Sequence, residues 1–507
     1  MSARSSTASR RRSSAPSGSD EAVVTQTRVR QTFALLWASE TAFDLGSALM
    51  TFALGVWLFQ QTESAQQFSM AIVATAFPSL LMTPVAGALA DRFDRRWVIV
   101  GCDVCSAVLV AVLAVLVFQD RMQPGYLYAF NVASAVVGSI RIPAYRAAMG
   151  SIVPRERLTQ AGALIGLTQS VFQVAVPLVA GYLMAALGLT GIVTVNILLV
   201  AAGAIAAFGG LSRSRQAVRG VERAGRSSLF RETALSVRSA LAYLREVPMM
   251  AGLSIYGAIQ EALVVLAASM MIPLVLSTHA SEAVGLILSS GALGAVAGSG
   301  LLVVAPVRRR QMRWMLVAQL SVSLMLVLVG LASSTVLWAL CAFGAYFGGA
   351  TSTACALALL LRKTRVESRG SLFALNAALN GIMVCVAMLV GGYFAHHVFE
   401  PALLAGGAWA STVGAWVGTG KGRGLAFVFI VCGAAGGLMS LVALLSPRFR
   451  DFDEGTPDPA DEPTTATPPA AAHPEPRARG HAPGVDELLA CEPTSPERPG
   501  VAVDHST

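Results

Sequence analysis

Three carboxylates inside apolar segments are the residues of this sequence best placed to do chemistry. Glu40 and Asp44 are four residues apart, so on a helix they lie one turn apart on the same face, and Glu261 follows Gln260 in a later segment. A carboxylate facing lipid is costly, so we expect these side chains to face the protein interior or a wet cavity. There each could bind and release a proton, and Glu40 and Asp44 would influence each other's titration. The structural alternative is a protonated or paired carboxyl that only packs helices together.

Residues 87 to 96 carry a second group of charges between two apolar runs. They read Gly-Ala-Leu-Ala-Asp-Arg-Phe-Asp-Arg-Arg, and a charged stretch between two membrane-length segments should lie at a membrane surface. The residues that could act there are Gly87, Asp91, Arg92, Arg95 and Arg96. Glycine lets two helices approach closely, and the arginines can pair with the carboxylate or with lipid phosphates. An ordinary positively charged loop is the alternative interpretation.

Asp103 and two arginines form a third group. Asp103 lies early in the next apolar segment, and Arg141 and Arg146 lie at the end of the segment after it. If the segments cross the membrane in alternating directions, all three residues lie a short way inside the same face. Pairing Asp103 with Arg141 or Arg146 would offset the cost of burying these charges. Direct contact with a bound substrate is the alternative.

The composition shows what must position these groups. Of the 507 residues, 54% are apolar and 13% are charged, whereas soluble proteins carry roughly 25% charged residues. A membrane-spanning helix needs about 20 apolar residues. Twelve such segments occur, at 32–59, 68–90, 97–119, 124–146, 158–186, 189–211, 249–276, 283–305, 313–331, 334–361, 370–396 and 424–446. We therefore predict an all-α membrane protein with twelve transmembrane helices.

Polar stretches divide the predicted helices into two sets of six. The arginine-rich stretch 212–247 predicts a cytoplasmic linker between an N-terminal half at 31–211 and a C-terminal half at 248–446. The outer stretches 1–30 and 447–507 are too polar to bury a core, so we expect disordered tails.

The loop charges predict the topology. Arginines gather in every second loop, whereas the loops between hold little beyond Arg121, Lys421 and Arg423. By the positive-inside rule, both termini are then cytoplasmic. The formal net charge of +8 thus reflects topology, and we expect no nucleic-acid partner. Lys363 and Lys421 are the only lysines among the basic residues, which suggests a GC-rich bacterial source and a bacterial plasma membrane.

Other polar residues in the segments suit packing. Cys102 and Cys105 form a C-x-x-C without a second pair, which favours packing over a metal site, and we expect no metal. Asn376 and Asn380 repeat at one-turn spacing, which predicts hydrogen bonds between helices rather than ligand contacts.

The order of residues from Gly87 to Arg96 resembles the loop between helices two and three of the major facilitator superfamily, Gly-x-Leu-Ala-Asp-Arg-x-Gly-Arg-Arg. Asp94 stands where the wider family usually has glycine. Three further stretches look like the macrolide-efflux-like branch of bacterial facilitators. They are Trp57-Leu58-Phe59-Gln60, Val153-Pro154-Arg155-Glu156-Arg157-Leu158 and Phe399-Glu400-Pro401.

This resemblance implies a fold and a mechanism. It implies a monomeric exporter of an amphipathic organic compound, driven by proton antiport with alternating access and needing no cofactor beyond the proton gradient. In this superfamily helices one, four, seven and ten commonly line the cavity. The resemblance therefore indicates these cavity residues: Glu40, Asp44, Asn131, Gln260, Glu261 and Thr351. It also implies that Asp103 and Arg141 join the loop charges in a cytoplasmic gate.

Other functions stay open. Val176-Pro177 and Ala180-Gly181 keep only part of the glycine-rich pattern of the family's antiporters, so import by proton symport is an alternative. A membrane enzyme would need a nucleophile and base near one interface, and His396-His397 is the single candidate, without facing acids. Because these histidines lack facing acids, we predict a transporter and not an enzyme. A non-transporting sensor or scaffold is a further alternative.

Overall fold

A computed structural model describes residues 18–92, 94–152, 158–213, 248–305, 307, 309–364, 366–450 and 452 of the chain. Within this part it describes the backbone alone at residues 18–30, 83–92, 95–96, 147, 150–152, 158–163, 165–166, 210–213, 366–371 and 448. The described residues form helices and connecting loops without a β-strand, which confirms the predicted all-α class. Helices are favoured here because long apolar runs in lipid must satisfy their backbone groups internally.

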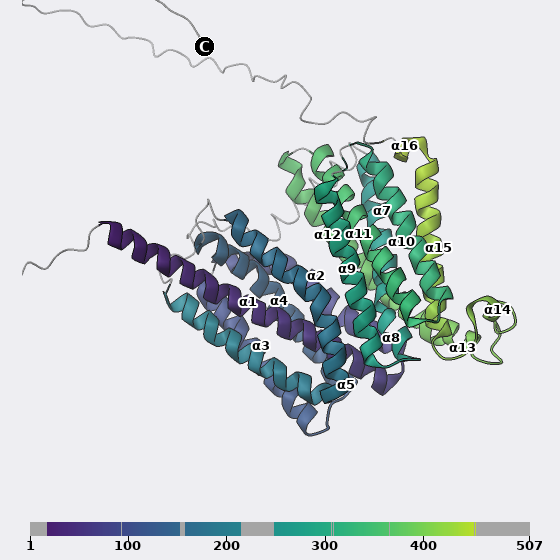
Figure 1. The fold of residues 1–507 in the computed structure, drawn as a ribbon, viewed down its shortest axis with the longest axis horizontal. Coiled ribbons are helices and arrows are strands. Elements are labelled where there is room, and N and C mark those ends of the chain that lie inside the picture. Colours follow the sequence, from purple (N-terminus) through teal and green to yellow (C-terminus); the bar gives the residue numbers. More distant parts are fainter. Residues whose placement is uncertain are drawn as a thin grey trace, which may run out of the picture. The chain divides into compact units, whose positions relative to one another are not determined.

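Figure 1 shows the helices in two groups. The first group comprises α1 (Gly18–Thr62), α2 (Ala65–Arg92), α3 (Arg95–Phe118), α4 (Pro124–Ile152) and α5 (Leu158–Arg213). The second comprises α7 (Pro248–Ser269), α8 (Met271–Leu276), α9 (Ser281–Val304), α10 (Gln311–Leu331), α11 (Thr335–Lys363), α12 (Val366–Phe394) and α15 (Arg423–Leu445). Shorter elements are a π-helix (Ala395–Phe399), α13 (Glu400–Leu403), α14 (Gly414–Val417) and α16 (Pro447–Arg450).

The number of spans agrees with the sequence prediction once α5 is divided. Eleven helical stretches of the described chain are long and apolar enough to cross a membrane, and one of them, Leu167–Gly209, has 43 residues. Gly188 breaks this stretch, with φ 65° and ψ −169°. Glycine adopts a positive φ without the steric penalty of a side chain. The break lies between the predicted segments 158–186 and 189–211, so α5 contains two spans.

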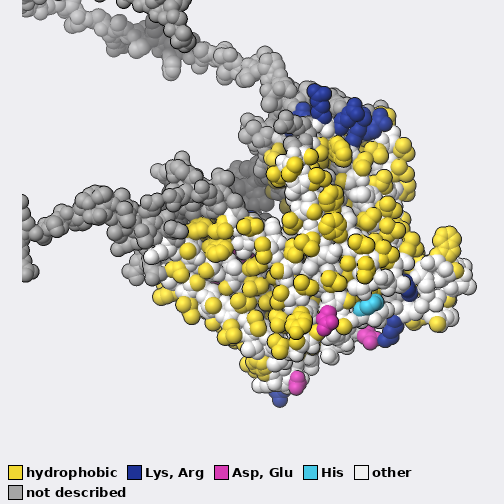
Figure 2. Space-filling view, in the orientation of Figure 1, with side chains coloured by type: hydrophobic (Ala, Val, Ile, Leu, Met, Phe, Trp, Pro, Cys, Tyr) yellow, Lys and Arg dark blue, Asp and Glu magenta, His cyan; other side chains and the backbone are white. Residues whose placement is uncertain are grey.

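The surface suits lipid. Large apolar side chains point outward along the helices, among them Ile205, which is 74% exposed, and Val303, which is 83% exposed. Figure 2 shows apolar side chains over the flanks of the bundle, with Lys and Arg side chains gathered at one end of the second group and acids, histidine and a few further basic side chains at the other. Such apolar flanks need a lipid or protein partner.

The main contacts between the groups are those of α5 with α9 and of α2 with α12, and α1 also contacts α8. Small residues allow the first contact, because a Cβ on Gly285 would lie 2.5 Å from the carbonyl oxygen of Pro177. Ser281 Oγ donates a hydrogen bond to the Gly181 carbonyl at 3.3 Å. Ser289 Oγ donates one to the Val174 carbonyl at 2.5 Å. These bonds fix the register of the two groups.

We call the end where α1 enters and α15 leaves the tail end. The opposite end, which carries the connections 63–64, 119–123, 277–280, 332–334 and 395–422, is the loop end. Ser281 is the first residue of α9 at the loop end, and its bond to Gly181 therefore joins the groups there.

The helical bundle extends further into both predicted tails than the sequence indicated. Helix α1 begins at Gly18, inside the predicted tail 1–30, because a helix extends by single residues at little cost once it is nucleated. At the other terminus, Phe452 is buried and Phe449 packs against Tyr256, with ring centroids 6.1 Å apart. These apolar rings hold the start of the predicted tail 447–507 on the bundle. Residues 1–17, most of the linker 212–247 and residues 453–507 lie outside the described part.

Candidate functional site

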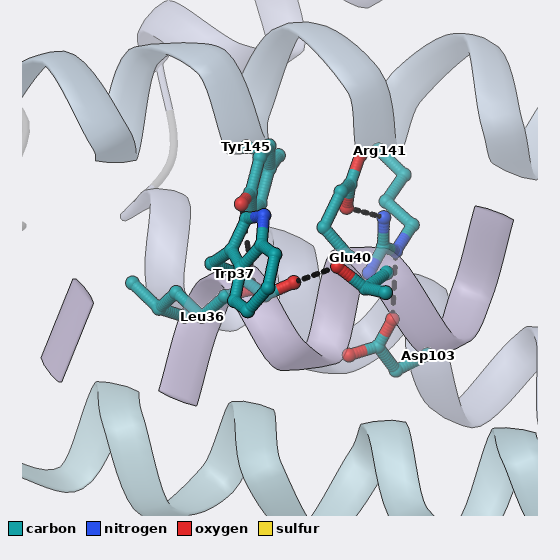
Figure 3. A network of polar contacts seen from close by, with 7 residues as sticks. Leu36, Trp37, Glu40, Asp103, Arg141 and Tyr145 are labelled. Carbon is teal, nitrogen blue, oxygen red and sulfur yellow. Dashed lines mark hydrogen bonds and ion pairs between the residues drawn. The ribbon is translucent and has the colours of Figure 1, made fainter. Parts of the chain in front are cut away.

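Arg141 of α4 lies between two carboxylates, Glu40 of α1 and Asp103 of α3 (Figure 3). Its Nε donates a hydrogen bond to Asp103 Oδ1 at 2.8 Å, and its Nη1 donates one to Glu40 Oε2. The arginine side chain is 1% exposed. We call these three residues the charged cluster. A buried guanidinium is tolerated because charge-assisted bonds replace its water.

Aromatic rings complete the surroundings of Arg141. The ring centroid of Phe43 lies 4.0 Å from Arg141 Cζ, and that of Tyr145 lies 5.9 Å away. Such cation–π contacts add attraction without needing a second charge. Tyr145 also donates a hydrogen bond from its hydroxyl to the Leu36 carbonyl at 3.3 Å, which ties α4 to α1.

The predicted pair between Asp103 and Arg141 is present, and Arg146 is exposed. Glu40, which we expected in the cavity beside Asp44, is instead bound to Arg141. The physical reason is that a buried guanidinium has five donors and one carboxylate cannot satisfy them all. Asp103 Oδ2 is buried with no hydrogen-bond partner among the described residues.

Asp44 lines a cavity of about 760 Å³ between the two groups of helices. We call it the Asp44 cavity. Gln169 and Gln173 of α5 line it with Asp44, and Tyr346 of α11 and Leu288 of α9 line it from the second group. The sequence left open whether Asp44 faces the protein interior or a cavity, and the structure places it in the lining of a cavity.

Glu261 lines a larger cavity of about 890 Å³, whose described lining residues all fall between Leu253 and Phe429. We call it the C-terminal cavity. Glu261 is the one charged side chain of that lining, and most of the remaining residues are apolar. Its neutral polar lining residues are Ser254, Tyr256, Gln260, Ser269, Gln319, Tyr346, Ser352, Thr353, Asn376 and Asn380. Pockets for small organic molecules have this character, apolar walls with a few polar groups.

Gln260 is the centre of a buried polar network. Its Nε2 lies 2.9 Å from the carbonyl oxygen of Gly436, 2.8 Å from Ser440 Oγ and 3.2 Å from the Tyr256 hydroxyl. Its Oε1 accepts a hydrogen bond from Gln319 Nε2 at 3.3 Å. We call Tyr256, Gln260, Gln319 and Ser440 the amide network. Although Gln260 lines the cavity as predicted, its amide is already engaged in holding α7, α10 and α15 together.

Two predicted cavity residues donate hydrogen bonds to backbone carbonyls instead. Asn131 Nδ2 donates a hydrogen bond to the Ala71 carbonyl of α2 at 3.1 Å, and Thr351 Oγ1 donates one to the Phe347 carbonyl on its own helix at 3.1 Å. Neither residue is among those that line the Asp44 cavity or the C-terminal cavity. A position on the fourth or the tenth membrane span, here α4 and α11, does not by itself fix which way a side chain points. The family pattern was therefore too coarse to predict these two residues.

Most of the predicted gate lies outside the described side chains. Helix α2 ends at Arg92 and α3 begins at Arg95, so the stretch forms the expected connection at the tail end. The side chains of Gly87, Asp91, Arg92, Arg95 and Arg96 are outside the described residues. Their predicted pairing stays a prediction.

Sequence reasoning missed Tyr346, which lines both cavities, and misread Asn376. Asn376 lines the C-terminal cavity with Asn380, and its buried Oδ1 has no hydrogen-bond partner among the described residues. One-turn spacing of two asparagines was the available signal, and it does not distinguish a helix contact from a cavity wall.

The family model described as Major Facilitator Superfamily matches residues 36–388. The chain belongs to the major facilitator superfamily. The match covers most of the described helices of both groups, and the chain is therefore a membrane transporter of this superfamily. The resemblance first drawn from Gly87 to Arg96 is confirmed.

Several known facilitators are similar to this chain. Macrolide efflux protein A of Streptococcus pyogenes is 26% identical over 166 residues, which are 33% of this chain and 41% of that protein. The enterobactin exporter EntS of Shigella flexneri is 29% identical over 155 residues, 31% of this chain and 37% of that protein. The chain thus matches less than half the length of these relatives. A mutant of the nucleoside transporter NupG shares the fold, with a TM-score of 0.61 and 14% identity over 82% of this chain and 99% of that one.

Proposed function

We propose that this facilitator exports an amphipathic small organic molecule across a bacterial plasma membrane by proton antiport with alternating access. One observation carries the proposal: Asp44 and Glu261, acids inside membrane-length helices, both line cavities of several hundred Å³. An acid in such a position is a functional-site hypothesis by default, because burying it for packing alone is costly. The similarity to proteins named for macrolide and enterobactin export supports the direction of transport.

The coupling rests on the charge of the two acids. An ionised carboxylate in a wet cavity keeps its water, so closing the cavity around it is costly. Protonation removes the charge and lowers that cost, which lets the helices pass through an occluded state. If the transporter must be deprotonated to bind substrate and protonated to change back to its first conformation, it exchanges protons for substrate.

The contacts between the two groups suit one state of this cycle. Ser281 bonds Gly181 at the loop end, and the α5 and α9 backbones approach closely at Pro177 and Gly285. With cytoplasmic termini, closure at the loop end corresponds to an inward-facing state. Export then requires these contacts to separate while the tail end closes.

Accumulation of labelled amphipathic compounds, including a macrolide, in cells with and without the protein tests the proposal. We expect lower accumulation with the protein, and a protonophore should abolish the difference. Higher accumulation would indicate import by symport. Unchanged accumulation for every compound class would remove the support for drug-type export.

Two substitutions test the proton coupling. We expect Asp44→Asn and Glu261→Gln each to impair efflux driven by an imposed proton gradient, because each removes a carboxylate charge on which the proposed cycle depends. Glu282→Gln is the matched control, since Glu282 lies at the start of α9 and in neither cavity lining. If both variants keep the pH dependence of the wild type, the two acids have no part in coupling.

A further inference from the structure

The charges that line the C-terminal cavity restrict what it can hold. Glu261 supplies one carboxylate, and the described lining contains no Lys, Arg or His. An anionic molecule there would lose its water and meet only a like charge, whereas a cation would gain a charge-assisted hydrogen bond.

The neutral polar groups of the same cavity add no second charge. The amide of Gln260 is engaged by Gly436, Ser440 and Gln319. Asn376 Oδ1 and Ser254 Oγ lack partners among the described residues, but both atoms are themselves buried. Glu261 is therefore the group of the described lining that can attract a charged ligand.

Tyr346 lies between this cavity and the Asp44 cavity. It lines both of them, as does Leu288. It is 41% exposed although it lies in the middle of α11, which agrees with open space on both of its sides. Gly291 of α9 makes room for the ring, because a Cβ there would lie 2.9 Å from Tyr346 Cδ2.

We propose that the C-terminal cavity is a binding site for apolar molecules that carry a protonated amine, and that Tyr346 separates it from the Asp44 cavity. The inference rests on the proposed function and assigns its two acids different duties. Glu261 binds the charge of the substrate, and Asp44, behind the tyrosine, carries the transported proton. Substrate and proton then need not occupy the same carboxylate.

Binding to the full chain in lipid nanodiscs tests the site without any gradient, so its outcome is independent of antiport. The probes are three radiolabelled naphthalenes of equal size, 1-naphthylmethylamine, 1-naphthylmethanol and 1-naphthoate, with empty nanodiscs as the blank. We expect the ammonium to bind about tenfold more tightly than the alcohol, and the carboxylate to bind most weakly. Tightest binding of the carboxylate would overturn the proposal.

Glu261→Gln should remove the preference for the ammonium over the alcohol, and the exposed control Glu282→Gln should keep it. If Glu261→Gln keeps the preference, or Asp44→Asn alone abolishes it, the two acids do not have the proposed separate duties. Asp44→Asn should therefore keep the binding preference for the ammonium and still lose gradient-driven transport.

The dividing role of Tyr346 has its own test. Adding Tyr346→Ala to Glu261→Gln joins the two cavities, so the ammonium should reach Asp44 and regain its preference. A third substitution, Asp44→Asn, should remove the preference again. Phe343→Ala is the matched control, because Phe343 lies one turn away on α11, is 39% exposed and is not part of either lining. Absence of the regain, or an equal regain with Phe343→Ala, would overturn this role.

Discussion

The two halves of the helix bundle bury polar side chains in opposite ways. The first helix of the N-terminal half, α1, contributes Glu40 to a cluster in which Arg141 bridges two carboxylates. The first helix of the C-terminal half, α7, contributes Gln260 to a network made only of amides and hydroxyls. Both arrangements join three helices. Only the first can change its charge.

The two arrangements differ in how much the loss of one member should destabilise the protein. Removing one member of a buried charged group leaves the others uncompensated, at a cost of about 3–5 kcal/mol. A hydrogen bond between helices in a membrane contributes about 0.6 kcal/mol on average. The charged cluster therefore depends on all of its members, whereas the amide network tolerates the loss of one bond.

The sharpest way to break this comparison is Arg141→Met. It leaves Glu40 and Asp103 buried without their cation, and we expect the free energy of unfolding to fall by about 3–5 kcal/mol. Thermal unfolding of the detergent-solubilised protein, followed by intrinsic fluorescence, measures the loss. Arg146→Met is the control, because Arg146 is exposed five residues further along α4. Equal stability of the two variants would show that the cluster does not hold the N-terminal half together.

Glu40→Gln and Asp103→Asn should have intermediate effects. Each removes one negative charge and leaves Arg141 one ion pair with the remaining carboxylate, so we expect a loss of about 1–3 kcal/mol from each variant. The cluster also predicts coupling, because Arg141→Met should cost less once either carboxylate is already neutral. A double-mutant cycle from the same unfolding measurement checks this. Strictly additive losses would mean that the three side chains act independently.

The parts predicted from the sequence are those fixed by one strong physical requirement. Lipid demands apolar runs of about 20 residues, so the spans were readable, including the two that meet at Gly188. Buried opposite charges need each other, so a pair between Asp103 and either Arg141 or Arg146 was predictable from their similar depth, and the structure shows that the partner is Arg141.

The parts that could not be predicted depend on how helices rotate against one another. Glu40 and Asp44 share a face of α1, yet Glu40 turns to Arg141 and Asp44 lines a cavity. The amide network joins α7, α10 and α15, and one-turn spacing within a helix carries no information about such partners. Tyr346 was missed for the same reason.

Gln260→Met tests the other half of the comparison, the uncharged amide network. It removes the hub of the amide network at nearly constant volume, and the Ser440 hydroxyl keeps its bonds to the Tyr256 hydroxyl and the Gly436 carbonyl. We expect a loss of about 1 kcal/mol in the free energy of unfolding, well below that of Arg141→Met. Gln60→Met, at an exposed position of α1, is the control. A loss as large as that of Arg141→Met would contradict the distinction between charged and neutral burial.

An ion pair in water completes the series with the smallest expected effect. Lys421 Nζ lies 2.9 Å from Glu63 Oε2 at the loop end, and the two side chains are 68% and 69% exposed. The pair joins the two halves, but water solvates both charges almost as well when they are apart, so Lys421→Met should cost no more than about 0.5 kcal/mol. Unfolding measured at low and high salt tests this, because any contribution of the pair should vanish at high salt. A salt-independent loss near that of Arg141→Met would mean that position, and not burial, decides the value of a charge in this bundle.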